Sequence, residues 1–396
     1  MDKDNQRLFS LTYILLTCIN LMTALGYSMI ATIISPYAVT LGAGLTLAGT
    51  LSGIFSLSAL VIRPFSGMAL DILDKRNICL LSTLLMGVSF AGYAIAPNIA
   101  VMLFFRILHG MAFGINGTAI LVLISEVLPE KRLGEGIGYF GLGQIVAQII
   151  GPNAGIAIKG RFGYQFLFFI IAGLTLLSVG LLLLIKREKP GTEKVLKVKK
   201  TFSRKNILAK ECLVYALVGG LFSLGNGVTT SFLVLVGEER NISGIGIFFT
   251  VNAVVLLVMR LLMGRVIDRI GLGIIVNISL ALTAASMFFL GISQGLLLFL
   301  AAGVLKAAGQ GGGQISLQSA CIRKVEPARV GIATSTYFIG ADIGQGLGPV
   351  LGGRISEAFS YRGMYLGTAV LMLLGILVFN LYQGKNRRLV SEAAGL

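Results

Sequence analysis

The stretch "GLGQIVAQIIGPNAG" (141–155) decides the fold, because its pattern returns 197 residues later in "GADIGQGLGPVLGG" (340–353). The shared positions are Gly143 and Gly340, Gly151 and Gly348, Pro152 and Pro349, and Gly155 and Gly352. The same offset relates Arg63 and Arg260, Gly67 and Gly264, Asp71 and Asp268, Arg132 and Arg329, and Gly134 and Gly331. Nine identities in one register indicate that the second half of the chain repeats the first.

The composition places both copies in a membrane. The 396 residues are 55% hydrophobic and only 13% charged, with a mean hydropathy of +0.87, whereas soluble domains carry roughly 25% charged residues. A spanning helix needs about 20 mostly apolar residues. Twelve stretches qualify: 9–33, 44–68, 77–96, 98–124, 134–158, 164–186, 211–236, 243–265, 272–292, 294–320, 329–353 and 361–383. We therefore predict an all-α integral membrane protein with twelve transmembrane helices in two pseudo-symmetric six-helix bundles.

The basic residues predict the orientation of these helices. Of the 33 Lys and Arg residues, 24 fall on the side of the two chain ends and 5 in the opposite loops. This bias predicts a multi-pass protein of the cytoplasmic (inner) membrane with both termini cytoplasmic. The expected domains are an N-terminal bundle (1–186), a basic cytoplasmic linker (187–210) and a C-terminal bundle (211–396). We interpret the net charge of +16 as orientation and contact with anionic lipid headgroups, not as nucleic-acid binding.

The repeat also predicts how the protein works. Six helices per half give both halves the same orientation, so the axis that relates them runs along the membrane normal. Two such bundles place a binding site between them near the midplane and expose it by rocking. This arrangement is typical of a transporter.

Further motifs resemble those of the major facilitator superfamily. "GMALDILDKR" (67–76) is similar to its signature loop at Gly67, Asp71, Lys75 and Arg76, with Ile72 and Asp74 as departures. The second copy, "GRVIDRIG" (264–271), contains Gly264, Asp268, Arg269 and Gly271. The resemblance implies that this loop gates the cytoplasmic side.

Two other motifs extend the resemblance. "RILHGMAFG" (106–114) resembles the fourth-helix motif of the family, with His109 where glutamine is usual. Gly151, Pro152, Gly348 and Pro349 belong to a helix-packing motif that is associated with antiporters in this family; Ala147 and Ile156 replace two of its glycines in the first copy. The resemblance implies a fold of two six-helix halves, a generally monomeric protein and a twelve-helix drug:proton antiporter of the efflux group.

One glycine-rich helix is unusually polar. In "VLKAAGQGGGQISLQ" (304–318), Lys306, Gln310 and Gln314 follow one another at intervals of four residues and form a stripe. A phosphate-binding loop would need a glycine–lysine–serine/threonine order and a soluble βαβ unit, and neither is present. We therefore predict a helix that lines a cavity.

Charged groups within spans are expensive in lipid and mark function. Arg106 and Lys306 lie deep in their spans, and Asp342 is the acid placed well inside a helix. Lys306 is the predicted partner of Asp342, either as a structural pair or as a pair broken by protonation or substrate. His109 is equivalent to Lys306 in the repeat and is expected to share its cavity, either as a packing residue or as a proton sensor.

The expected sites follow from these groups. Proton coupling is assigned to Asp342, His109 and Arg106. The expected cavity consists of Lys306, Gln310, Gln314, Asn20, Tyr27, Gln144, Asn226 and Asn252. Most phenylalanines and methionines are expected to face lipid or to pack between helices. One His and four separated cysteines argue against a metal site.

The leading hypothesis is efflux of a small organic molecule in exchange for protons. No nucleotide-binding domain is recognised, so a proton gradient and no cofactor would drive transport. The cavity balances Arg106 and Lys306 against Asp342, so the alternative is proton-coupled uptake or export of an organic anion or a metal-chelating metabolite. No nucleophile–base pair supports a membrane enzyme, and no appended soluble domain supports a sensor.

Overall fold

The computed structural model describes residues 9–129, 132–185, 208–326 and 329–393, although the side chains of some helical residues in these ranges are not described. Within them the chain forms twelve long helices, one short helix and one 3-10 turn. The first half contains α1 (Leu11–Ala31), α2 (Ile34–Thr40), α3 (Leu45–Ile72), α4 (Lys75–Ile95), α5 (Ile99–Val127), α6 (Leu133–Phe162) and α7 (Tyr164–Leu184). The second half contains η4 (Lys210–Cys212), α8 (Leu213–Glu239), α9 (Ile247–Ile270), α10 (Leu272–Ile292), α11 (Leu296–Arg323), α12 (Val330–Ala358) and α13 (Tyr361–Ala393).

The all-helical membrane fold is confirmed, with two local differences. The short helix α2 lies where a loop was expected between the first two spans. Helix α13 extends to Ala393, beyond the expected end of its span at residue 383. Most of the predicted linker 187–210 lies outside the described residues, so the division into domains stays a prediction.

Short polar and glycine signals set the helix ends. The side chains of Ser10, Asp74 and Asn98 accept hydrogen bonds from the first turns of α1, α4 and α5, which satisfies backbone donors that have no partner within the helix. Gly163 and Gly271 have φ of 86° and alone separate α6 from α7 and α9 from α10. Glycine adopts this left-handed conformation without a steric penalty, so these reversals need almost no loop.

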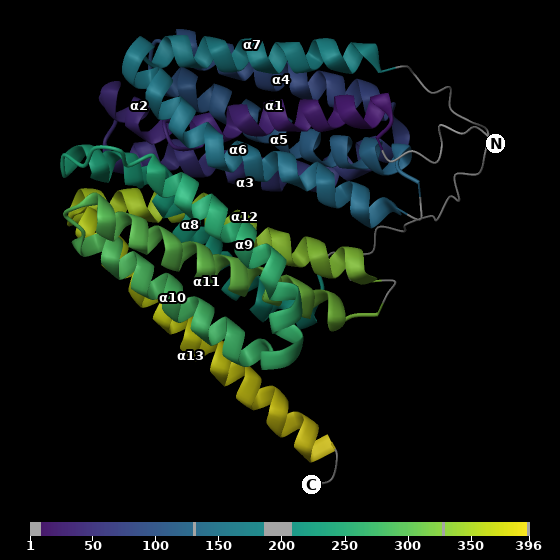
Figure 1. Cartoon of the computed structure of the whole chain (residues 1–396), viewed down its shortest axis with the longest axis vertical. Helices are drawn as coiled ribbons and strands as arrows, with labels where there is room; N and C mark the ends of the chain where they lie inside the picture. Colours follow the sequence, from purple (N-terminus) through teal and green to yellow (C-terminus); the bar gives the residue numbers. More distant parts are fainter. Residues whose placement is uncertain (1–8, 130–131, 186–207, 327–328, 394–396) are drawn as a thin grey trace.

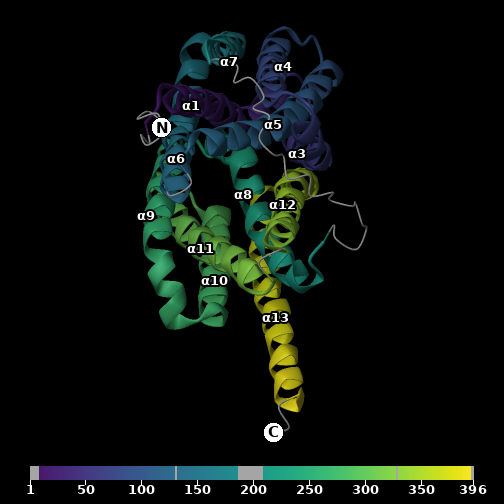
Figure 2. The same ribbon diagram turned by 90° about the vertical axis from the view of Figure 1, so that its right-hand side faces the viewer.

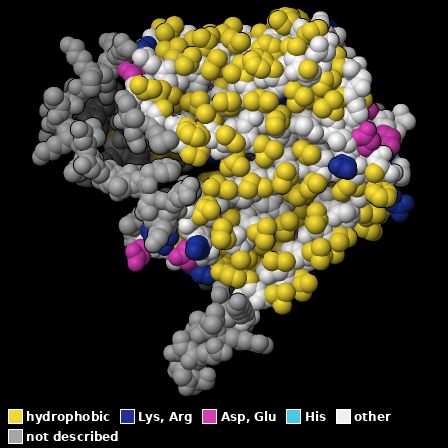
Figure 3. Space-filling model, turned by 180° about the vertical axis from the view of Figure 1, so that it is seen from behind, with side chains coloured by type: hydrophobic (Ala, Val, Ile, Leu, Met, Phe, Trp, Pro, Cys, Tyr) yellow, Lys and Arg dark blue, Asp and Glu magenta, His cyan; other side chains and the backbone are white. Residues whose placement is uncertain are grey.

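The outer surface is suited to lipid. Ten of the described helices are long and apolar enough to cross a membrane, and α9 contains a shorter apolar stretch, Ile247–Met263. Large side chains such as Leu217, Leu261 and Leu297 are exposed on the surface. Figure 3 shows apolar side chains across most of one face, with charged side chains mainly toward its two ends. In water such a surface would drive aggregation, whereas in a bilayer it contacts acyl chains.

The two halves form separate groups of helices (Figures 1 and 2). We call the end where α1 begins and α7 ends the terminal side, which is on the right in Figure 1, and the other end the opposite side. The most extensive contacts between the halves are those of α3 with α12 and of α6 with α9. The repeat relates these pairs to each other, because α6 corresponds to α12 and α3 to α9. Helix α13 runs away from the first half toward the terminal side.

The α3–α12 contact is close because both helices carry glycines there. A Cβ atom on Gly49 or Gly53 of α3 would overlap the carbonyl oxygen of Pro349 or Gly346 of α12. Glycine therefore lets the two backbones touch, as at other close helix crossings in membranes.

The related α6–α9 contact is built differently. The repeat places Ile149 in α6 where α12 has Gly346, and Thr250 in α9 where α3 has Gly53. Side chains fill this seam instead: Asn153 donates to the Thr250 hydroxyl at 2.7 Å, and that hydroxyl donates to the carbonyl oxygen of Ile149 at 3.1 Å. The internal symmetry of the fold is therefore broken by sequence at the junction of the halves.

Gly344 of α12 provides a test of packing inside the second half. A Cβ at Gly344 would overlap the carbonyl oxygen of Gly220 in α8. We expect Gly344→Val to destabilise the protein by about 1–3 kcal/mol, because overpacking displaces the backbone. Gly141→Val is the control, since no atom lies within 4 Å of a Cβ there. The measurement is the midpoint of thermal unfolding in detergent, and equal midpoints for the two variants would contradict the packing argument.

Candidate functional site

A cavity of about 320 Å³ lies between the halves, at the middle of the helices. Helices α1, α3, α5 and α6 line it on one side, and α8, α9, α11 and α12 on the other. Six predicted site residues line it: Tyr27, Asn226, Asn252, Gln310, Gln314 and Asp342. Pro152, predicted as a packing residue, also reaches it. The polar stripe of α11 was therefore placed correctly at Gln310 and Gln314, whereas Lys306 does not line the cavity.

Other predicted cavity residues lie elsewhere. Asn20 is buried and donates to the carbonyl oxygen of Phe140 at 3.4 Å, so it joins α1 to α6. Gln144 is exposed, and its neighbour one turn on, Gln148, lines the cavity instead. Asn20 lies two turns before Tyr27 and Gln144 one turn before Gln148, so the error is one of position along the helix axis.

Sequence reasoning missed the phenylalanines of this site. Phe55, Phe113 and Phe249 line the cavity, although phenylalanines were expected mainly at lipid or between helices. In an apolar helix, a phenylalanine facing a cavity and one facing lipid give the same pattern. The one signal that the sequence offered was a polar neighbour that also lines the cavity, as Ser56 does beside Phe55.

Asp342 pairs with a residue of the other half. Its carboxylate lies 3.2 Å from Nε of Arg63 in α3, so the predicted pairing with Lys306 is wrong. The Asp342 side chain is 18% exposed and that of Arg63 41% exposed, and both line the cavity. The pair spans the junction of the halves.

Lys306 is buried, 2% exposed, behind the wall of the cavity. Its ammonium donates to Oδ1 of Asn226 at 2.8 Å and to Oε1 of Gln310 at 3.1 Å. Both amides line the cavity. Lys306 therefore acts on the cavity through neutral side chains, and its partners come from α8 and its own helix α11.

His109 and Arg106 form a second buried cluster, inside the first half. Nδ1 of His109 lies 3.1 Å from the Tyr93 hydroxyl. Nε of Arg106 donates to the carbonyl oxygen of Leu51 at 2.9 Å, and its guanidinium lies 4.6 Å from the centre of the Phe55 ring. Neither residue lines the cavity, so the prediction that His109 and Lys306 share it is wrong. Their coupling role remains a prediction.

The gating motif is only partly described. The side chains of Gly67, Asp71, Gly264 and Asp268 lie outside the described residues. Arg76 donates to the carbonyl oxygens of Leu182 and Leu183 at 3.2 and 3.0 Å and holds α4 to the end of α7. Arg269 is exposed at the end of α9. The gating role stays a prediction.

The helix-packing motif lies where helices cross, both within each half and between the halves. A Cβ atom on Gly151 would collide with Ser28 of α1, and one on Gly348 with Leu224 of α8. Pro349 stands at the α3–α12 crossing, where its carbonyl oxygen faces Gly49. These positions contact neighbouring helices, and Pro152 alone of the four also lines the cavity.

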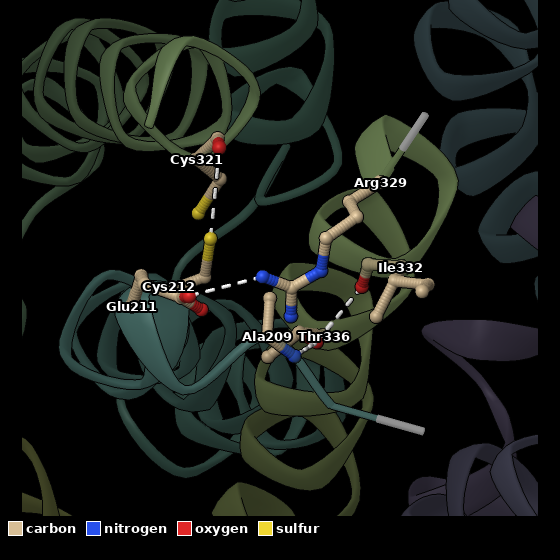
Figure 4. A network of polar contacts seen from close by, with 7 residues as sticks. All are labelled: Ala209, Glu211, Cys212, Cys321, Arg329, Ile332 and Thr336. Carbon is tan, nitrogen blue, oxygen red and sulfur yellow. Dashed lines mark hydrogen bonds and ion pairs between the residues drawn. The ribbon is translucent and has the colours of Figure 1, made fainter. Parts of the chain in front are cut away.

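A polar network lies at the terminal side of the second half (Figure 4). Arg329 forms an ion pair with Glu211 at 3.0 Å, and Thr336 accepts from the backbone N–H of Ala209 at 2.9 Å. Cys212 and Cys321 lie near each other as free thiols. The network ties the start of α12 to the segment that precedes α8.

Two helical halves around a cavity at mid-membrane form the architecture of a secondary transporter. The sequence profile of the Major Facilitator Superfamily matches residues 16–244 and 215–394. The chain belongs to this superfamily, whose members are transporters and not enzymes.

Individual relatives are distant. The chain is 27% identical over 376 residues to the multidrug resistance protein MdtG of Escherichia fergusonii, covering 90% of each chain. It is 21% identical over 345 residues to the staphylopine export protein of Staphylococcus aureus, covering 84% of this chain and 86% of the relative. Among solved structures, a bacterial homologue of the human lysosomal transporter Spinster matches with a TM-score of 0.80 and 15% identity, over 96% of this chain and 97% of the other.

Proposed function

We propose that this transporter exports a small organic molecule across the cytoplasmic membrane in exchange for protons. The observation that carries the proposal is the Arg63–Asp342 ion pair, which joins the two halves inside the cavity. Asp342 is the one acid among the described residues that line this cavity. Relatives named for multidrug resistance and for export support the direction.

In this mechanism a proton competes with Arg63 of the other half for the carboxylate of Asp342. Protonation of Asp342 removes its charge and releases Arg63, so one tie between α3 and α12 is lost. For the gradient to drive transport, the proton must bind the two states of the transporter with different affinity. An ion pair that forms between moving halves supplies such a difference.

The terminal side is assigned to the cytoplasm in this proposal. The excess of Lys and Arg on that side supports the assignment, since cytoplasmic loops carry more positive charge. The protein would act as a monomer with substrate, proton and lipid as its partners.

A second candidate is proton-coupled uptake or export of an organic anion or a metal-chelating metabolite. The charges around the cavity favour it: Arg63 and Arg260 line the cavity and Lys306 lies behind its wall, against the single described acid Asp342. A named relative that exports staphylopine is consistent with a charged cargo.

Proteoliposomes that contain a trapped pH dye test both candidates. Pools of cationic, anionic and zwitterionic solutes are added outside, with protein-free liposomes as the control. Exchange moves protons out as solute enters, so the lumen becomes alkaline, whereas co-transport makes it acidic. The sign of the signal therefore separates exchange from co-transport, and the pool that produces it shows whether the solute is an anion. Absence of a signal with every pool would contradict both candidates.

A further inference from the structure

The cavity has two unlike walls. The first half contributes three aromatic rings that stack on one another. The rings of Tyr27 and Phe55 lie 5.2 Å apart at 25°, and those of Tyr27 and Phe113 lie 5.0 Å apart at 26°. All three residues line the cavity. A stacked cluster of this kind presents an apolar surface to which a planar ring can add by stacking or edge contact.

A buried cation lies behind this aromatic wall. The guanidinium of Arg106 lies over the Phe55 ring, and Arg106 is 2% exposed. Among the described residues no carboxylate forms an ion pair with it, and its Nη1 atom has no hydrogen-bond partner. The aromatic surface is therefore backed by uncompensated positive charge.

The second half contributes a wall of amides whose orientation is fixed by Lys306. An ammonium donates hydrogen bonds and accepts none. Asn226 and Gln310 must therefore turn their oxygens toward Lys306 and their N–H groups away from it.

The same direction continues along the wall. The Asn226 amide donates to Oε1 of Gln345 at 3.0 Å. The Gln310 amide donates to Oε1 of Gln314 at 3.3 Å, and Gln314 donates to the Ser223 hydroxyl at 3.2 Å. In each of these amides the oxygen already accepts a hydrogen bond, so the amide N–H donates to the next residue.

Both chains end in donors at the cavity. Gln345 keeps its amide N–H groups and Ser223 its hydroxyl hydrogen without a partner among the described residues, and both line the cavity. Arg260 lines the same cavity and forms no ion pair with a described residue. The acid in this wall, Asp342, is already matched by Arg63. The unpaired donors and the positive charge of this wall therefore suit a group that accepts hydrogen bonds and carries negative charge.

We propose that the cavity takes a planar aromatic carboxylate, with its ring against Tyr27, Phe55 and Phe113 and its carboxylate against the donors that Lys306 orients. Lys306 is a positioning residue here, because it acts through Asn226 and Gln310. This inference rests on the proposed function in taking the cavity as the transport site, and it holds for export and for uptake.

Equilibrium binding to the purified full-length protein tests the substrate class. The probes are 2-naphthoate, 2-naphthalenemethanol, 2-naphthylmethylammonium and the saturated decalin-2-carboxylate, measured by titration calorimetry. We expect 2-naphthoate to bind at least about tenfold tighter than the ring-matched alcohol and ammonium. We also expect it to bind several-fold tighter than the saturated acid. Equal or tighter binding of the alcohol or the ammonium would overturn the proposal.

Two variants separate the walls. Lys306→Met should reduce the preference for carboxylate over alcohol to about threefold or less and keep the preference for the aromatic ring. Phe113→Leu should reduce the preference for the aromatic ring over the saturated ring and keep the preference for carboxylate over alcohol. Arg260→Gln changes an exposed residue and keeps the carboxylate test available if Lys306→Met does not fold. Arg354→Gln and Phe288→Leu, both exposed and away from the cavity, are the matched controls.

These measurements distinguish failure of this inference from failure of the proposed function. If none of the four probes binds while another solute moves protons in liposomes, the aromatic carboxylate is wrong and the transport function stands. If 2-naphthoate binds with the expected preferences but no solute moves protons, the site is right and proton coupling is wrong. If Lys306→Met or Arg260→Gln keeps the full carboxylate preference, the donor wall is not what selects the ligand.

Discussion

Asp342→Asn is expected to abolish solute-driven proton movement in proteoliposomes, down to the level of liposomes without protein. Asparagine has nearly the same shape as aspartate but neither gains nor loses a proton at physiological pH. Protonation could then no longer make or break the contact with Arg63, which is 3.2 Å away in the native protein. Membrane insertion and purification should be unaffected, because loss of a charge inside the bilayer does not disfavour insertion. The measurement is the trapped-dye signal under a solute that drives the wild type.

The variant Arg63→Gln distinguishes a role of the ion pair in proton coupling from a purely structural role. If the ion pair only holds the halves together, removing either partner should have the same effect on transport. If Asp342 carries the proton, Arg63→Gln should keep coupled movement but shift its pH profile toward higher pH, since a neighbouring cation favours the charged carboxylate. Glu326→Gln, an exposed acid away from the cavity, controls for loss of an acid. Proton movement that survives in Asp342→Asn would direct the search for the coupling group to His109 and Arg106.

Gly53→Val is expected to stop transport while leaving each half folded. A Cβ at Gly53 would overlap the carbonyl oxygen of Gly346 across the junction of the halves. Overpacking of this kind costs about 1–3 kcal/mol, which changes the ratio of two conformations by roughly 5- to 150-fold. Only the conformation in which α3 and α12 touch is penalised, so the transporter should accumulate in the other one.

The conformational shift can be measured by labelling. A single cysteine replaces Gln314, which lines the cavity, in a protein without its native cysteines. Gly53→Val should lower the reaction of this cysteine with a membrane-impermeant maleimide from one side of the membrane and raise it from the other. Gly141→Val, in α6 with open space around it, should leave labelling unchanged. Unaltered labelling and transport in Gly53→Val would mean that this contact is not part of the transport cycle.

The comparison of Gly53 with Gly344 shows how position decides the effect of one substitution. Both glycines face a backbone carbonyl oxygen of another helix. Gly344 packs inside the second half, so its substitution is expected to lower stability. Gly53 packs between the halves, so its substitution is expected to shift a conformational equilibrium. The sequence contains both glycines but does not say which contact crosses the junction.

The sequence by itself determined the all-helical membrane fold, the two repeated halves and the polar stripe of α11. These features depend on constraints that act locally: lipid leaves backbone groups no partner except within a helix, charges avoid the hydrocarbon, and a repeat is read by alignment. The apolar length of each span and the spacing of Lys306, Gln310 and Gln314 needed no knowledge of neighbouring helices.

Only the tertiary structure decided which side chains meet. It paired Asp342 with Arg63 of the other half, gave Lys306 two amide partners, and brought Tyr27, Phe55 and Phe113 together from three helices. The physical reason is that partner choice depends on the rotation of each helix about its axis and on how closely two backbones approach. Those quantities follow from packing of the whole bundle, such as the glycine contact of α3 with α12, and not from the periodicity of any one helix.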